Sequence, residues 1–149
     1  MAVESRPYPT RSVLTQRIRD CRRHNIIDQT GVAPGEVAIY TLSDPRDVRV
    51  VRYVGQTRNP QSRLTQHLNA ARLWLPDERP WWIPQQQLRP LYTWIRELHG
   101  DGGRLPVMFV VGWTTAQLAR RDERRFVREF VAAGLPLLNH EAAGRGVQT

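Results

Sequence analysis

The pattern of apolar and polar positions divides the chain into segments with the spacing of helix, strand, strand, helix, helix, strand and helix, in that order. Apolar residues recur at helical spacing from Thr10 to about Asn25, which predicts a first helix. Residues 36–43 and 48–55 have the composition of strands. The turn-forming residues 43–47 lie between them, so we expect a β-hairpin.

A second helix is expected to begin at Pro60, because Asn59 is a good N-terminal cap and proline suits the first helical turn. We expect it to run to about Leu73. A third helix is expected over residues 89–99. Residues 106–111 are apolar throughout and predict a buried strand.

The last helix is expected to be capped by Thr114 or Thr115, to run to about Ala133 and to stop at Gly134. Together, these segments predict an α+β fold. We expect a small, about three-stranded and mostly antiparallel sheet that is flanked by helices.

At 149 residues the chain is expected to form one domain with a core of its own. We divide it into an N-terminal extension with one helix (residues 1–35), a main domain (36–142) and a C-terminal tail (143–149). Residues 74–90 form an irregular insertion in the main domain, with tryptophans, prolines and three consecutive glutamines.

Composition narrows the class of protein. Cys21 is the only cysteine, so neither an intrachain disulfide nor a thiolate zinc site can form. The chain has no run of 18 apolar residues and no recognisable secretory signal. We therefore expect no membrane association and a cytoplasmic location.

The net charge of +8 and the isoelectric point of about 11.1 favour a polyanionic partner. All 22 basic residues are arginine, whose planar guanidinium matches phosphate better than an ammonium does. A GC-rich genome would also explain the missing lysine, but it does not explain the excess of positive charge.

Candidate chemistry begins in the predicted hairpin, which places Tyr40 and Tyr53 on neighbouring strands. The glycine-led turn of residues 55–60 then leads into a helix N-terminus, a suitable environment for an anion. Arg63 and His67 follow one helical turn apart on one side of that helix. These four side chains could converge on one phosphate.

A carboxylate accompanies the apolar stripe of the last helix. Glu123 precedes Phe126 and Val127 by three and four residues, so it lies on or beside the core face. Burying a carboxylate is costly unless it is paired. A bound divalent cation would remove that cost, and so would an ion pair with an inward-facing arginine such as Arg63.

With these residues in order, the chain resembles the GIY-YIG nuclease superfamily over roughly residues 36–140. Ala38-Ile39-Tyr40 corresponds to the first signature of the family and Tyr53-Val54-Gly55 to the second. Arg63 follows the second tyrosine by ten residues, as the helix arginine of the family does, and His67 matches a histidine found in many members.

Two further positions resemble the family downstream: Glu123 its metal-binding glutamate, and Asn139 its terminal asparagine. The chain departs from the pattern at Ala38, which replaces a glycine, and at Gln56, where some members have lysine. The 16 residues from Glu123 to Asn139 exceed the spacing of compact members. Glu129 is therefore the rival metal ligand, although it lies one position off the apolar stripe.

The resemblance implies that the protein is an endonuclease that hydrolyses phosphodiester bonds with a single Mg²⁺, or Mn²⁺, held by Glu123. Tyr40 would activate or position the attacking water, with His67 as a proton relay because a phenol is a poor base at neutral pH. Arg63 would neutralise charge developing on the phosphate. Tyr53 and Asn139 would orient these groups.

DNA, single- or double-stranded, is the expected substrate, and RNA stays an alternative. We expect nucleic-acid contacts from the turn before the second helix and from the last helix: Gln56, Thr57, Arg58, Arg120, Arg121 and Arg124. Trp81 and Trp82 could stack on bases, or could cover the third helix together with Trp94. Specificity would come from the 74–90 insertion, the N-terminal helix, the second copy of a homodimer, or substrate shape.

Two other readings of the sequence stay open. The protein could be a nucleic-acid-binding module that keeps the nuclease fold without turnover. It could also be a basic structural protein whose agreement with the motif is accidental.

Overall fold

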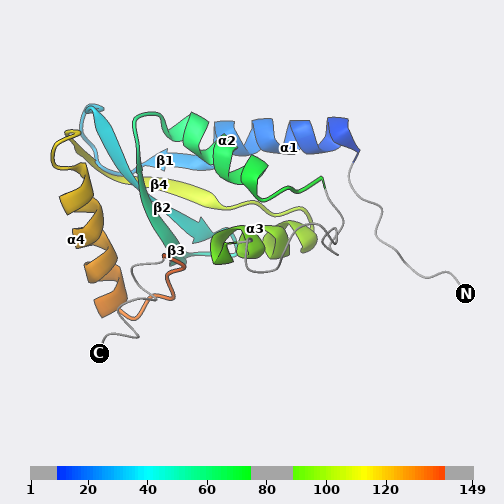
Figure 1. Cartoon of the computed structure of the whole chain (residues 1–149). Helices are drawn as coiled ribbons and strands as arrows, with labels where there is room; N and C mark the ends of the chain where they lie inside the picture. The colour runs from blue at the N-terminus through cyan, green and yellow to red at the C-terminus, as the bar shows by residue number, and fades with distance from the viewer. Residues whose placement is uncertain (1–9, 75–88, 140–149) are drawn as a thin grey trace, which may run out of the picture.

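The structure is a computed structural model that describes residues 10–74 and 89–139 (Figure 1). Most of the predicted 74–90 insertion, including Trp81 and Trp82, lies outside these ranges, as do the first nine residues of the predicted N-terminal extension and the 143–149 tail. The elements of the described part are α1 (Arg11–His24), β1 (Ile26–Asp28), β2 (Val37–Asp44), β3 (Asp47–Thr57), α2 (Pro60–Ala70), α3 (Pro90–Gly100), β4 (Val107–Thr114) and α4 (Ala119–Ala132).

The described strands form one mixed sheet in the order β1-β4-β2-β3. β2 pairs antiparallel with β3 and with β4, whereas β1 pairs parallel with β4. The α+β class is thus confirmed, but the expected three-stranded, mostly antiparallel sheet is wrong: the sheet has a fourth strand, and that strand is parallel. The sequence does not reveal β1, because its three residues are too few for periodicity and begin at Ile26, directly after the C-terminal cap of α1, Asn25.

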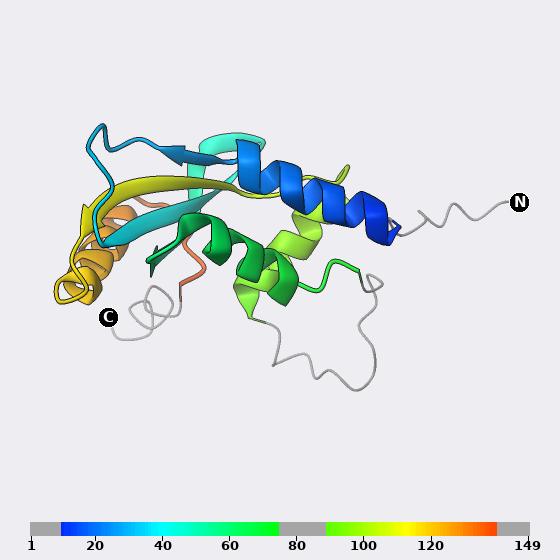
Figure 2. The same cartoon turned by 90° about the horizontal axis from the view of Figure 1, so that it is seen from above.

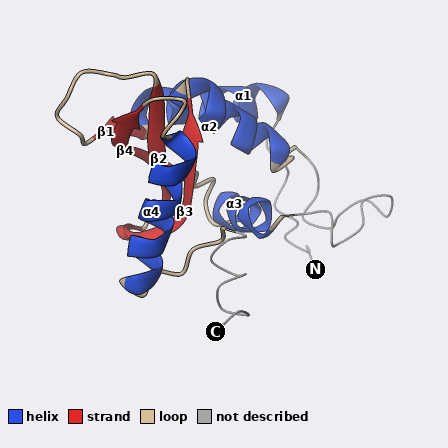
Figure 3. Ribbon diagram, turned by 60° about the vertical axis from the view of Figure 1, so that its left-hand side comes forward, coloured by secondary structure: helices blue, strands red, loops and turns tan. Residues whose placement is uncertain are grey.

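Helices cover both faces of this sheet (Figures 1 and 3). On one face, α1, α2 and α3 pack against Tyr40, Leu42 and Met108. On the other face, α4 packs through Val127 against Ile39. Every residue of β2 from 37 to 43 is buried, because the strand is central in the sheet and covered on both sides.

The ends of α2 follow from its capping residues. Asn59 Oδ1 accepts a hydrogen bond from Ser62 N (3.0 Å) and Pro60 occupies the first turn, as predicted. The helix ends at Ala70, earlier than the expected Leu73, because residues 71–74 form turns. Seen from above, α2 lies close to α1 (Figure 2).

The beginning of α4 is a correction to the sequence prediction. Neither Thr114 nor Thr115 caps this helix, which begins about one turn later at Ala119. Thr114 ends β4. Thr115 Oγ1 instead accepts from Leu118 N (3.3 Å) and so stabilises the turn before the helix. Gly134 ends the helical segment with a φ of 83°, as predicted.

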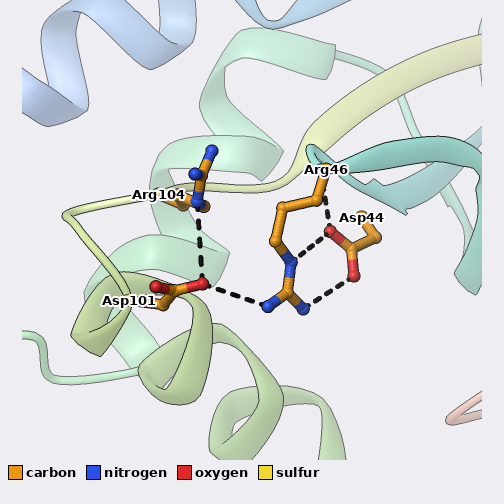
Figure 4. Close-up of polar contacts among 4 residues, drawn as sticks. All are labelled: Asp44, Arg46, Asp101 and Arg104. Carbon is orange, nitrogen blue, oxygen red and sulfur yellow. Dashed lines mark hydrogen bonds and ion pairs between the residues drawn. The ribbon is translucent and has the colours of Figure 1, made fainter.

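Ion pairs stabilise the turn between β2 and β3 (Figure 4). Arg46 contacts Asp44 (2.8 Å) and Asp101 (3.1 Å), and Arg104 also approaches Asp101 (3.7 Å). These side chains join the β2–β3 turn to the loop after α3. Because most of them are solvent-exposed, water screens each pair and its contribution to stability is small.

None of the helices in the described ranges combines the length and apolar character needed to cross a lipid bilayer.

Candidate functional site

The centre of the candidate site is a buried contact between β2 and α2. The hydroxyl of Tyr40 lies 2.7 Å from Nε2 of His67. Both side chains are almost fully inaccessible, with exposed fractions of 1% for Tyr40 and 5% for His67. The sequence placed both residues at the site, and the fold brings them into direct hydrogen-bonding contact.

The surroundings of Tyr40 and His67 determine which of the two side chains carries the proton. Burial, and then the positive charges of Arg63 and Arg89, lower the pKa of His67 to about 4. Burial, and then the neighbouring Tyr53, raise the pKa of Tyr40 well above its ordinary value. At neutral pH the imidazole is therefore uncharged and the phenol protonated, so that the phenol can donate to Nε2.

Gly55 is required by this arrangement. It lies opposite Tyr40 in the β2–β3 register. A Cβ atom at position 55 would overlap the Tyr40 hydroxyl and lie 2.8 Å from Cε1 of the ring. Gly55 thus gives the phenol its space above β3.

Tyr53 and Tyr92 complete an aromatic cluster with Tyr40 and His67. The Tyr53 ring lies edge-on to His67 at a centroid distance of 5.5 Å and 6.3 Å from the Tyr40 ring. The Tyr92 ring, on α3, lies 6.3 Å from His67. Sequence analysis predicted the helix that carries Tyr92 but not its place here, which depends on how α3 packs beside α2.

Arg63 supplies the positive charge of the site from the first turns of α2. After burial, its charge is the largest cause of the lowered His67 pKa. The Nε atom of Arg63 is buried and has no hydrogen-bond partner among the described residues. Arg89 also acts on the pKa of His67, a contribution that sequence analysis missed because Arg89 precedes a helix remote in the chain.

Glu123 lies on α4, which packs on the opposite face of the sheet, and contacts the site through a residue of the edge strand β3. Its Oε2 accepts a hydrogen bond from the side-chain amide of Gln56 (3.3 Å). After burial, the charge of Glu123 is the largest cause that raises the pKa of Tyr53. The rival Glu129 lies at a solvent-exposed position near Arg125, 3.9 Å away.

Asp122 is a second buried carboxylate on α4 that the sequence did not indicate. Asp122 is buried and accepts a hydrogen bond from the Thr114 hydroxyl (2.6 Å), which is the largest cause of its lowered pKa. Arg121 also pairs with it (3.1 Å). Because these partners satisfy Asp122, it serves to attach α4 to the end of β4. The Thr114 hydroxyl, predicted as a helix cap, thus binds the side chain of Asp122 instead.

Asn139 lies beside the site as a clamp on β3. Its Nδ2 donates to Val54 O (2.7 Å) and its Oδ1 accepts from Val54 N (2.9 Å). The buried amide thus makes the two hydrogen bonds to Val54 that the backbone of a neighbouring strand would otherwise make. Since Val54 follows Tyr53 directly, this clamp fixes the backbone that carries the second tyrosine.

An open cleft of about 540 Å³ adjoins this cluster where β3 leads into α2. The predicted nucleic-acid-binding residues Gln56, Thr57 and Arg58 line it, together with Arg63. The predicted contacts on α4 lie elsewhere: Arg120, Arg121 and Arg124 are exposed on that helix and do not line the cleft.

The residues present fit a hard divalent cation only with ligands from outside the chain. In residues 10–74 and 89–139, no three His, Cys, Asp or Glu side chains gather in one place. Glu123 would then be the protein's carboxylate ligand. Mg²⁺ commonly binds one or two carboxylates and takes its other oxygens from water and substrate phosphate, so the donor set is compatible with it.

Comparison with protein-family models, with curated proteins and with solved structures gives no match to this chain.

Proposed function

We propose that this protein is a metal-dependent endonuclease of the GIY-YIG type that hydrolyses phosphodiester bonds of DNA. The observation that carries the proposal is the buried 2.7 Å contact between the Tyr40 hydroxyl and His67 Nε2. The tyrosine is hydrogen-bonded to an uncharged imidazole, and a guanidinium and a carboxylate lie close by. Such a group of side chains can transfer a proton beside a bound phosphate.

The proton path follows from the two pKa shifts. With its pKa raised, Tyr40 is a poor base on its own. His67 is uncharged near neutral pH and can accept the phenolic proton. Tyr40 therefore takes a proton from the attacking water as it passes its own to Nε2, and the imidazole, whose pKa is lowered, gives that proton up again so that the leaving oxygen is protonated.

Charge stabilisation is assigned to Arg63 and Glu123. Arg63, which lines the cleft, neutralises the charge that develops on the phosphate oxygens through its guanidinium. Glu123 would hold Mg²⁺, or Mn²⁺, which when bound supplies electrostatic stabilisation to the phosphate and the leaving oxygen. Gln56 keeps the carboxylate in place through its hydrogen bond.

A second candidate function is nucleic-acid binding without turnover. The observation that favours it is the 1% exposed fraction of Tyr40, which leaves the phenol little contact with solvent. The basic surface and the cleft would serve binding in either case.

Exchange of Glu123 for glutamine separates these functions. Purified wild-type protein, Glu123→Gln and the matched control Glu129→Gln are incubated with plasmid, single-stranded DNA and RNA, in Mg²⁺, Mn²⁺ or EDTA. We expect Glu123→Gln to lose roughly a hundredfold or more in cleavage rate. Its DNA affinity and circular dichroism spectrum should match the wild type, and Glu129→Gln should cleave normally.

Each contrary result has its own meaning. If Glu129→Gln is the inactive variant, the metal ligand is Glu129. If the wild type binds DNA but cleaves nothing in either metal, the protein is a binding module. If RNA alone is cut, the substrate assignment to DNA fails.

A further inference from the structure

The cleft beside the catalytic cluster is built as a binding site in its own right. Its volume of about 540 Å³ is within the range of sites for small ligands, roughly 300–1,000 Å³. It shares Gln56 and Arg63 with the site described above and extends from them along α2 to Gln66. A molecule in the cleft would therefore lie directly beside the reacting phosphate.

Some of the polar groups around the cleft serve to shape it. The Thr57 hydroxyl donates to Asn59 O (3.0 Å) and accepts from Asn59 N (3.1 Å). The Asn59 side chain caps α2 at Ser62 N, and the Gln56 amide holds Glu123. These interactions fix the wall between β3 and α2 before any ligand enters.

Other groups of the cleft are available to a ligand. The side chains of Arg58, Ser62 and Gln66 make no hydrogen bond with any residue in the described ranges, and the Arg63 guanidinium also lines the cleft. Two guanidiniums suit anionic oxygens. The hydroxyl and the amide each offer both a donor and an acceptor. This combination matches a nucleotide, which has phosphate oxygens and a base edge.

We propose that the cleft binds the nucleotide next to the scissile phosphate and that Gln66 reads its base. This inference rests on the proposed function. Arg58 contacts the outer phosphate of that nucleotide, and Ser62 contributes a hydroxyl beside it. Adenine is the expected base, because its N7 acceptor and N6 donor match a glutamine amide in two parallel hydrogen bonds.

Mapping of cleavage sites tests this assignment. A library of random-sequence DNA is cut by the wild type, by Gln66→Ala and by Gln61→Ala, and the ends are sequenced. Gln61 is the matched control, since it is an exposed glutamine on the same helix that does not line the cleft. We expect adenine to be enriched about tenfold at one position flanking the cut. Gln66→Ala should lose that preference and Gln61→Ala should keep it.

A binding measurement separates this inference from the proposed function. In EDTA, fluorescence anisotropy compares short single-stranded oligonucleotides that contain one adenine with all-thymine oligonucleotides. A preference for adenine that Gln66→Ala abolishes supports the base-reading role even if no cleavage occurs. Equal base profiles, or equal affinity ratios, for Gln66→Ala and the wild type would overturn it, whatever the rate of cleavage.

Discussion

The hydrogen bond between Tyr40 and His67 joins two groups whose pKa values move in opposite directions, both chiefly through burial. A charged imidazolium would be unfavourable in this enclosure, beside Arg63 and Arg89. The pair is therefore held in its neutral form across the physiological pH range. In the proposed mechanism that state suits a transient relay, because Nε2 can accept a proton and, with its pKa lowered, readily releases it again.

The lowered pKa of His67 makes the stability of the protein depend on pH. The His67 pKa is 6.5 in the unfolded reference and about 4 in the folded protein, so the unfolded state binds the proton more readily between these values. The free energy of unfolding should therefore fall as pH decreases from 6.5 to 4, by about 3 kcal/mol for the full shift. Urea unfolding at a series of pH values measures it.

His67→Gln is the comparison for this experiment, because glutamine can still accept a hydrogen bond from Tyr40 but does not titrate. We expect the variant to have a much flatter pH dependence between pH 4 and 6.5. Parallel curves for the variant and the wild type would show that His67 is not the group responsible.

At the scale of residues, sequence spacing was informative where one helix or one hairpin sets the geometry. It placed Arg63 and His67 on one side of α2, and Tyr40 beside Tyr53 on paired strands. It could not show that Tyr40 lies over Gly55 or that Tyr92 joins the cluster. Those contacts depend on packing between elements that no local pattern records.

Among the elements, the clamp formed by Asn139 gives the most direct test of how β3 is held. Asn139→Ala would leave the N–H and C=O of Val54 without their present partners in a buried environment. We expect the free energy of unfolding to fall by about 2 kcal/mol. Cleavage by the folded protein should fall as well, because Tyr53 loses its backbone support.

Asn69→Ala provides the control, since Asn69 is exposed on α2. Its substitution should change stability by no more than about 0.5 kcal/mol. Chemical denaturation of both variants under one condition makes the comparison. Equal stability of Asn139→Ala and Asn69→Ala would contradict the role of the clamp.

Elements with strong local signals were predicted well, and those without them were not. The Asn59-Pro60 pair marked the beginning of α2, and Gly134 marked the end of α4. β1 was missed because its three residues are held by backbone pairing to β4, a strand remote in sequence. The beginning of α4 was wrong because two threonines that look like caps belong to a strand end and a turn.

Over the whole molecule, the excess of arginine sets the expected behaviour toward a polyanion. The net charge is +8, and Arg120 and Arg124 are exposed on α4. If about six phosphates are neutralised, DNA affinity should fall by roughly a thousandfold between 50 and 200 mM salt. Fluorescence anisotropy with a labelled duplex in EDTA, repeated over this range, gives the slope.

The double variant Arg120→Ala and Arg124→Ala should reduce the magnitude of that slope by about two. Arg49→Ala is the matched control, because Arg49 is exposed but pairs with Asp47 at the hairpin (3.0 Å). An affinity that does not respond to salt would argue against phosphate contacts as the main source of binding.

The clamp on β3 also has a consequence for how the protein meets other polypeptides. Unpaired strand edges invite β-strand addition and aggregation. Beside the site, however, Leu138 N donates to Arg52 O, and Asn139 occupies both backbone groups of Val54. An incoming strand finds these hydrogen-bonding positions already filled. At Val54, the edge strand that carries Tyr53 offers an incoming strand no unoccupied backbone group, and at Arg52 the carbonyl is occupied as well.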